Sequence, residues 1–130
     1  MISNFSELLK AAEDQKEPQR LLFLFAKAEK AKKKKNKSHQ KGTITPVMCV
    51  DKLPSEITDF DSFVVEADSI SKEWDFMLTA GLNGKDGVAP TTEEAEPYLN
   101  QMTNQLASGQ DISQFVIFDR EENPIDIMSN

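Results

Sequence analysis

The chain has 130 residues, of which 38% are hydrophobic, and it carries one cysteine and a formal net charge of −7 at pH 7. This length favours one domain with a buried core, and this hydrophobic content excludes an intrinsically disordered chain. No apolar run approaches the roughly 20 residues of a membrane-spanning helix, and Met1–Phe5 lacks the basic start of a signal peptide. A single cysteine forms no internal disulfide. We therefore expect a cytoplasmic protein with no transmembrane segment.

Charge is distributed unevenly along the chain. Residues 1–41 hold eleven Lys and Arg against five Asp and Glu, whereas residues 42–130 hold four against seventeen. The first part is therefore net +6 and the second net −13. An asymmetry of this size bears on the partners that the protein attracts and not on its fold.

The first half of the chain predicts one helix and a two-stranded hairpin. Residues 4–14 repeat apolar side chains at helical spacing. The continuous apolar run Leu21–Ala26 fits a strand buried on both faces, with a helix segment as the alternative, and a β-rich run resumes at Thr43–Val50. Pro46 lacks an N–H, so we expect it at an edge, a bulge or the start of its strand. Residues 27–42 between the two strands form a lysine-rich, flexible loop.

The second half predicts two helices, a third strand and a closing hairpin. Thr91 and Glu94 have the spacing of a capping box, which indicates that the last helix begins there and runs toward Gly109. The other expected elements are a helix at 59–71, a strand at 74–80, a turn at 83–87, and strands at 115–118 and 125–127 on either side of a turn at 119–123.

The predicted order of elements is therefore α-β-β-α-β-α-β-β, with three helices and about five strands. This order indicates a single α/β (α+β) domain over residues 1–130, built as a sandwich of helices on a mixed sheet. The two hairpins supply antiparallel pairs, and the helical connections around the third strand supply parallel ones.

The most distinctive candidate site is the lysine-rich loop, whose repelling charges keep it extended and solvated. Such a loop attracts nucleic acid, an anionic surface or an acidic protein. No aromatic residue lies between Phe25 and Phe60 to stack on a base, and no arginine lies in the loop to contact one. Nucleic acid is therefore not the favoured ligand, and an enlarged loop with no specific role is the competing interpretation. The candidate binding residues are Lys32, Lys33, Lys34, Lys35, Lys37 and Lys41.

The stretch Gly81–Gly87 links a strand to a helix, which is where proteins often hold phosphate groups. Lys85 is followed by Asp86 and not by serine or threonine, so the phosphate-loop pattern is not matched. Three glutamates within residues 93–96 already occupy the positive end of the following helix. A simple glycine-rich turn is therefore favoured over a phosphate site.

Cys49 lies in an apolar strand pattern, which favours a buried position over a catalytic one. A reactive thiolate needs a nearby base or positive charge, and the sole histidine, His39, lies in the lysine-rich loop. One Cys and one His exclude a metal site made of these residues. The acidic residues at 59–68 leave an all-carboxylate site open, although helix-spaced acids usually form a solvated face. We predict no catalytic residues, no metal and no cofactor.

Four stretches of the chain have a familiar pattern. They are Pro18–Phe23 leading to Phe25–Glu29, Thr45–Lys52, Ala89–Glu96 and Phe118–Arg120. Over nearly the whole chain they resemble a family of small bacterial proteins that often carry the label "ribonucleotide reductase subunit alpha". The large reductase subunit needs a radical cysteine and a redox pair of cysteines, so a chain with one cysteine does not catalyse that reaction alone. The resemblance implies no catalytic residues and, at most, an accessory role.

The leading hypothesis is a non-enzymatic protein-binding or regulatory domain, because no nucleophile, base and oxyanion donor come together in the sequence. Its partner would be another protein or a second copy, for which Leu21–Ala26 or the closing hairpin offers a sheet edge. One alternative is polyanion binding through Lys30–Lys41. The other is a small enzyme or accessory factor that uses Cys49 or the Gly81–Gly87 loop.

Overall fold

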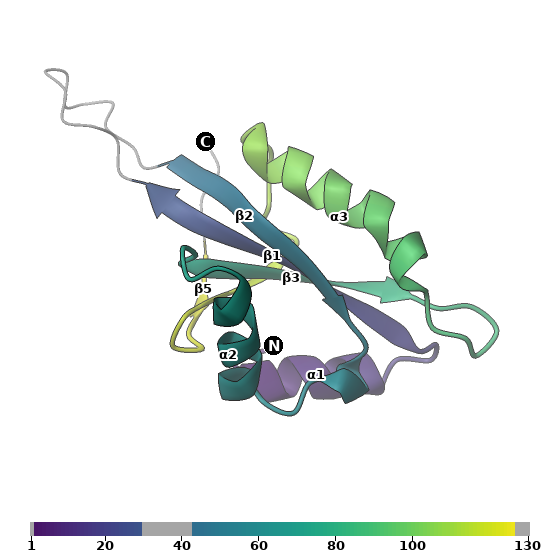
Figure 1. The fold of residues 1–130 in the computed structure, drawn as a ribbon. Helices are drawn as coiled ribbons and strands as arrows, with labels where there is room; N and C mark the ends of the chain where they lie inside the picture. Colours follow the sequence, from purple (N-terminus) through teal and green to yellow (C-terminus); the bar gives the residue numbers. More distant parts are fainter. Residues whose placement is uncertain (1, 30–42, 127–130) are drawn as a thin grey trace, which may run out of the picture.

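The computed structural model describes residues 2–29 and 43–126. In this part of the chain, three helices pack on one five-stranded sheet (Figure 1). The helices are α1 (Phe5–Glu13), α2 (Phe60–Ile70) and α3 (Thr92–Ala107), with a 3-10 turn, η2, at Pro54–Glu56. The strands are β1 (Gln19–Glu29), β2 (Thr43–Lys52), β3 (Phe76–Asn83), β4 (Val116–Asp119) and β5 (Pro124–Ile125). The predicted α/β class and order of elements are confirmed.

Among the described residues, all four strand pairings are antiparallel, in the order β2-β1-β3-β4-β5, so the predicted parallel pairs of a mixed sheet are wrong. The reason is the path of the chain. β2 and β3 run in the same direction, but β1 lies between them. After β3, helix α3 returns the chain along the sheet (Figure 1). β4 then enters the sheet in this returned direction, which makes it antiparallel to β3.

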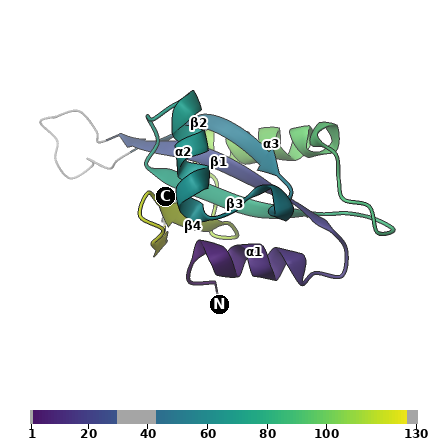
Figure 2. The same cartoon turned by 60° about the horizontal axis from the view of Figure 1, so that its bottom comes forward.

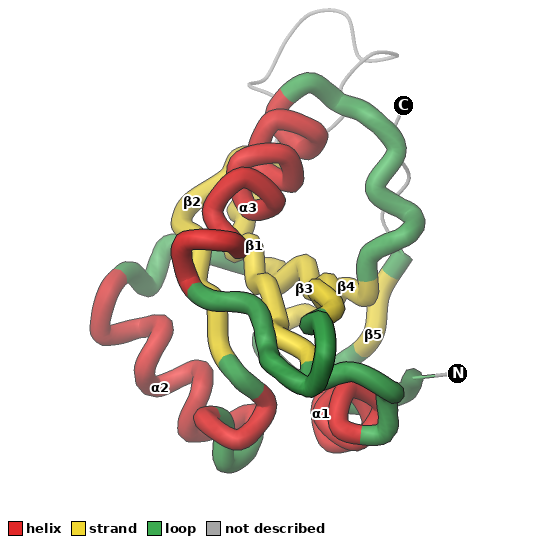
Figure 3. Tube along the Cα trace, turned by 90° about the vertical axis from the view of Figure 1, so that its right-hand side faces the viewer, coloured by secondary structure: helices red, strands yellow, loops and turns green. Residues whose placement is uncertain are grey.

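Strand β1 contributes side chains to two hydrophobic cores, one on each face of the sheet. Leu21, Phe23 and Phe25 face α1 and α2, whereas the alternate residues Leu22 and Leu24 face α3. All of these side chains are buried, which confirms a strand covered on both faces. Figure 3 shows α1 and α2 below the sheet and α3 above it, and Figure 2 shows α1 below the sheet from another side. Because β1 lies between β2 and β3, the expectation that Leu21–Ala26 forms a sheet edge is wrong.

Phe5 is the centre of a ring cluster that joins α1 to three other elements. Its ring centroid lies 6.0 Å from that of Phe23 in β1, 5.3 Å from Phe60 and 5.8 Å from Phe63 in α2, and 5.9 Å from Phe118 in β4. Aromatic pairs at these separations add to the stabilisation from burial alone. The cluster therefore fixes α1 and α2 against the same face of the sheet.

Trp74 was predicted inside the third strand, but the strand begins two residues later, at Phe76. The indole is 1% exposed and lies under the guanidinium of Arg120, whose Cζ is 4.1 Å from the ring centroid. Trp74 Nε1 donates to Asp68 Oδ1 at 3.0 Å, and Arg120 Nη2 donates to Asp68 Oδ2 at 2.7 Å. These three residues join α2, the entry to β3 and the turn after β4.

The predicted turn between the last two strands is confirmed and is organised by Asp119. Its carboxylate accepts hydrogen bonds from the backbone N–H groups of Glu121, at 2.8 Å, and Asn123, at 2.9 Å. Burial raises the pKa of this carboxyl, but the hydrogen bonds from Asn123 and Glu121 outweigh it and lower the pKa below its usual 3.8.

We expect NMR titration of Asp119 to give a midpoint below 3.8, its ordinary value. Because the folded-state pKa is lowered, ionised Asp119 stabilises the turn above the unfolded-state pKa, and this contribution is lost as the pH falls through the folded-state value. Asp119→Asn should therefore be less stable than the wild type at neutral pH and should lose this deficit in acid. A midpoint at or above the ordinary value would contradict the interpretation.

The first residues assigned to the predicted lysine-rich loop are strand instead. Lys27 and Ala28 belong to β1 and pair with Thr45 and Ile44, so residues 27–29 are strand. The predicted binding lysines 32–35, 37 and 41 lie outside the described residues, as does Ile127 of the closing hairpin. Within the described ranges, no helix combines the length and apolar character needed to cross a membrane.

Candidate functional site

Strand β3 extends beyond its pairing with β4. All eight of its residues pair with β1, from Phe76 opposite Ala26 to Asn83 opposite Gln19. β4 pairs only with Phe76–Thr79, which leaves Ala80–Asn83 without a described partner on that side. In an antiparallel ladder, every second residue directs both its N–H and its C=O away from its paired strand. Ala80–Asn83 therefore form an open edge within the sheet, which we call the β3 edge.

The conformation before β4 explains why the pairing stops at Thr79. The Thr79 hydroxyl donates to the carbonyl oxygen of Val116 at 2.9 Å. One residue earlier, the Phe115 N–H donates to Ile112 O at 3.1 Å, and Ile112 is buried in the core below α3. The chain thus turns away from β3 and does not continue the ladder toward Ala80.

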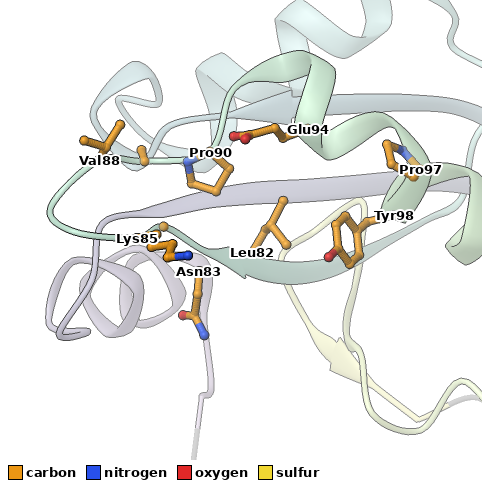
Figure 4. A pocket seen from close by; sticks show the side chains of 10 residues that line it. Leu82, Asn83, Lys85, Val88, Pro90, Glu94, Pro97 and Tyr98 are labelled. Carbon is orange, nitrogen blue, oxygen red and sulfur yellow. The ribbon is translucent and has the colours of Figure 1, made fainter.

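A groove with a volume of about 500 Å³ lies beside the β3 edge. It is bounded by the end of β3, the following turn and the first two turns of α3 (Figure 4). Figure 4 shows Leu82 directed toward α3 and Asn83 directed to the other side of the strand. Tyr98 descends from the helix beside Leu82 and is 48% exposed. The principal side chains of the groove are Leu82, Lys85, Val88, Glu94, Pro97 and Tyr98.

The turn at the end of the groove is held by backbone contacts. Gly84 N–H donates to Pro18 O at 2.8 Å, and a Cβ at Gly84 would lie 2.2 Å from Val88 O, so glycine is required there. Lys85 and Val88 exchange backbone hydrogen bonds of 2.9 and 3.0 Å. Gly87, which has a φ of 77°, donates its N–H to Glu17 Oε1. Three amides of the predicted glycine-rich turn, those of Gly84, Lys85 and Gly87, are therefore engaged within the protein, which favours a structural turn over a phosphate loop.

Arg20 fixes the start of α3 to the sheet. Its Nε donates to Pro90 O at 2.6 Å, and its Nη1 donates to Asp51 Oδ2 at 2.7 Å. The hydroxyl of Thr92 donates to the same carboxylate oxygen at 2.9 Å. The side chains of Arg20 and Asp51 are only 13% and 15% exposed. This network, which the sequence analysis missed, joins β1, β2 and α3 and sets the position of the helical wall of the groove.

The predicted capping box at the start of α3 is confirmed. The Thr91 hydroxyl accepts from Glu94 N at 3.1 Å, and Glu94 Oε1 accepts from Thr91 N at 2.9 Å. The exposed residues Glu93 and Glu96 add two further negative charges to these turns of the helix. The helical side of the groove is therefore acidic, whereas Lys85 on the opposite side supplies the positive charge of the lining.

Cys49 is exposed, so the expectation of a buried core cysteine is wrong. Its strand is the outer strand β2, and its Sγ lies 3.3 Å from Thr103 Oγ1 on α3. His39 lies outside the described residues. Among the residues that the structure describes, no group of three or more His, Cys, Asp or Glu side chains is placed to hold a metal ion.

Comparison of the chain with protein-family models, with curated proteins and with solved structures gives no match. The resemblance to the bacterial family therefore stays a prediction from the sequence. The β3 edge and the groove beside it are the features of the described residues that bear on function.

Proposed function

We propose that this protein is a non-enzymatic protein-binding domain that accepts an extended segment of a partner as an added strand beside β3. The observation that carries this proposal is the open β3 edge, Ala80–Asn83, with a groove along the helix-facing side of the strand. In strand addition, backbone hydrogen bonds supply affinity, and pockets for alternate side chains supply specificity.

The other sheet edges carry features that oppose strand addition. β2 contains Pro46 and a bulge, because Phe25 pairs with Met48 whereas Ala26 pairs with Pro46 and Val47 is left over. A proline and a bulge are devices by which proteins block pairing at an exposed edge. β5 is two residues long and starts with Pro124. The β3 edge has neither a proline nor a bulge, which supports it as the place for an added strand.

The groove offers apolar contacts to every second side chain of such a segment. A side chain on the α3 side of the added strand would meet Leu82, Pro97 and Tyr98. Side chains on the other side would lie next to Gly81 and Asn83, which are exposed and leave room. The site therefore supports recognition of alternating apolar residues.

We expect NMR spectra to show binding of terminally blocked heptapeptides in which Val alternates with Lys, Glu or Thr. At least one of them should shift the amide signals of Ala80–Asn83 and leave those of β2 unchanged. Tyr98→Ala should weaken this peptide at least ~5-fold, the effect of about 1 kcal/mol of lost contact. Val65→Ala changes a 70%-exposed residue on α2 and should leave the affinity for the peptide unchanged.

A peptide with the same side chains but with N-methyl groups on alternate residues provides the backbone control, because it lacks half of the amide donors. Strand addition predicts that this peptide no longer binds at the β3 edge. If none of the three heptapeptides moves the signals of Ala80–Asn83, the proposed function is wrong.

Polyanion binding through Lys30–Lys41 stays an alternative. These lysines lie outside the described residues, and the alternative rests on their positive charge in the sequence. Its test is nucleic-acid binding that falls steeply with added salt and is insensitive to sequence. The other alternative is an enzyme that uses the Gly81–Gly87 loop. The amides of this turn already donate hydrogen bonds within the protein, so they do not support a catalytic site there.

A further inference from the structure

We infer that the segment accepted by β3 is basic, with lysine or arginine side chains alternating with aliphatic ones. This inference rests on the proposed function and names the chemistry of its partner. It comes from the charges around the groove, from the exposed ring of Tyr98 and from the charge of the surrounding surface.

The charges next to the groove are predominantly negative. α3 contributes Glu93, Glu94 and Glu96 in its first two turns, and the turn contributes Asp86 next to Lys85, which gives a local net charge of −3. Within the described residues, none of these four acids takes part in an ion pair. Their charges therefore remain available to a cationic partner, and an acidic segment would be repelled by them.

Glu94 and Tyr98 lie four residues apart on α3, so they are neighbours on one side of the helix. Both line the groove (Figure 4). The aliphatic stem of a lysine or arginine can pack on Leu82 and on the half-exposed ring of Tyr98 while its charged head reaches Glu94. A neutral side chain would gain the apolar contact without the charge pair.

The surface beyond the groove has the same sign. Residues 42–130, which include β3, its turn and α3, carry a net charge of −13. A field of this sign increases the rate at which a basic segment arrives and opposes an acidic one. Lys85 opposes the binding of a basic segment, because its positively charged side chain lines the groove. Its removal should therefore strengthen the binding of a basic segment.

The test uses three terminally blocked heptapeptides, in which Val occupies every second position and the others are Lys, Glu or Thr. At low salt, we expect the Lys peptide to bind at Ala80–Asn83 at least ten-fold more tightly than the Glu peptide, with the Thr peptide between them. Glu94→Gln should weaken the Lys peptide several-fold, and Lys85→Gln should tighten it. Glutamine preserves the capping box, so E94Q changes the charge and keeps the helix start.

Glu121→Gln, in the β4–β5 turn beyond the Phe76 end of β3 and thus away from the groove, is the matched control for the loss of one negative charge. Equal effects of E94Q and E121Q, or equal binding of the three peptides, would overturn the basic preference. If the Glu or Thr peptide alone shifts the signals of Ala80–Asn83, strand addition stands and the basic preference is wrong. If the Lys peptide binds but its N-methylated counterpart binds equally well, strand addition itself fails.

Discussion

Trp74→Ala is expected to destabilise the protein by about 3–5 kcal/mol, the usual cost of truncating a large buried aromatic side chain. The indole is 1% exposed and packs on Phe25, with a centroid separation of 4.9 Å. Its loss would also remove the ring below Arg120 and the hydrogen bond to Asp68. Urea unfolding followed by circular dichroism measures the change in the free energy of unfolding.

Trp74→Phe separates the hydrogen bond from the packing. Phenylalanine keeps an aromatic ring but leaves one oxygen of Asp68 without its donor, so we expect a cost of about 2 kcal/mol. Val65→Ala provides the surface control and should stay within about 0.5 kcal/mol of the wild type. If Trp74→Ala costs no more than Val65→Ala, the residue does not anchor the fold as described.

Removal of one partner of the Arg20–Asp51 pair is expected to cost about 3 kcal/mol, because the remaining charge stays largely buried without its counter-charge. Arg20→Gln removes the positive charge and weakens the link to Pro90, whereas Asp51→Asn removes the negative charge to which Arg20 and Thr92 both donate. Urea unfolding of both variants and of the double variant measures the effect.

The double variant should cost less than the sum of the single variants, with a coupling energy of about 1–3 kcal/mol, because no lone charge remains. The same variants should weaken the peptide that binds beside β3, since Pro90 and Thr92 position the helical side of the groove. Strictly additive stabilities, together with unchanged peptide binding, would show that the pair neither couples the elements nor positions the site.

Local patterns in the sequence predicted most of the fold. The capping box at Thr91 and Glu94 and the apolar run Leu21–Ala26 lie within short stretches of chain, so their geometry follows from neighbouring residues. Strand order depends instead on contacts between distant segments. The sequence therefore indicated neither the central position of β1 nor the exposure of Cys49 on the outer strand β2.

The candidate site was less accessible to sequence reasoning, because it results from a difference in length between two paired strands. Nothing in Ala80–Asn83 alone indicates that β4 begins only at Val116 and so reaches no further along β3 than Thr79. The arginines of the sequence could have indicated where the hydrogen-bonded side-chain networks would form. The chain has two arginines, Arg20 and Arg120, and each forms a hydrogen-bonded pair with an aspartate. Each guanidinium also donates to a backbone carbonyl, of Pro90 or of Trp74, and arginine is suited to such partly buried positions because it presents several donors in a fixed plane.

The double-sided burial of β1 has a consequence for hydrogen exchange. Over Gln19–Ala26, β1 is flanked by β3, and over Leu21–Glu29 by β2, so its amides should exchange only when the whole domain unfolds. The outward amides among Ala80–Asn83 need no such event and should exchange rapidly. The slowest and some of the fastest amides of the sheet thus lie on adjacent strands. A bound partner strand would slow the exchange of the outward amides of Ala80–Asn83. The degree of their protection would therefore measure the fraction of the protein that has a partner strand bound.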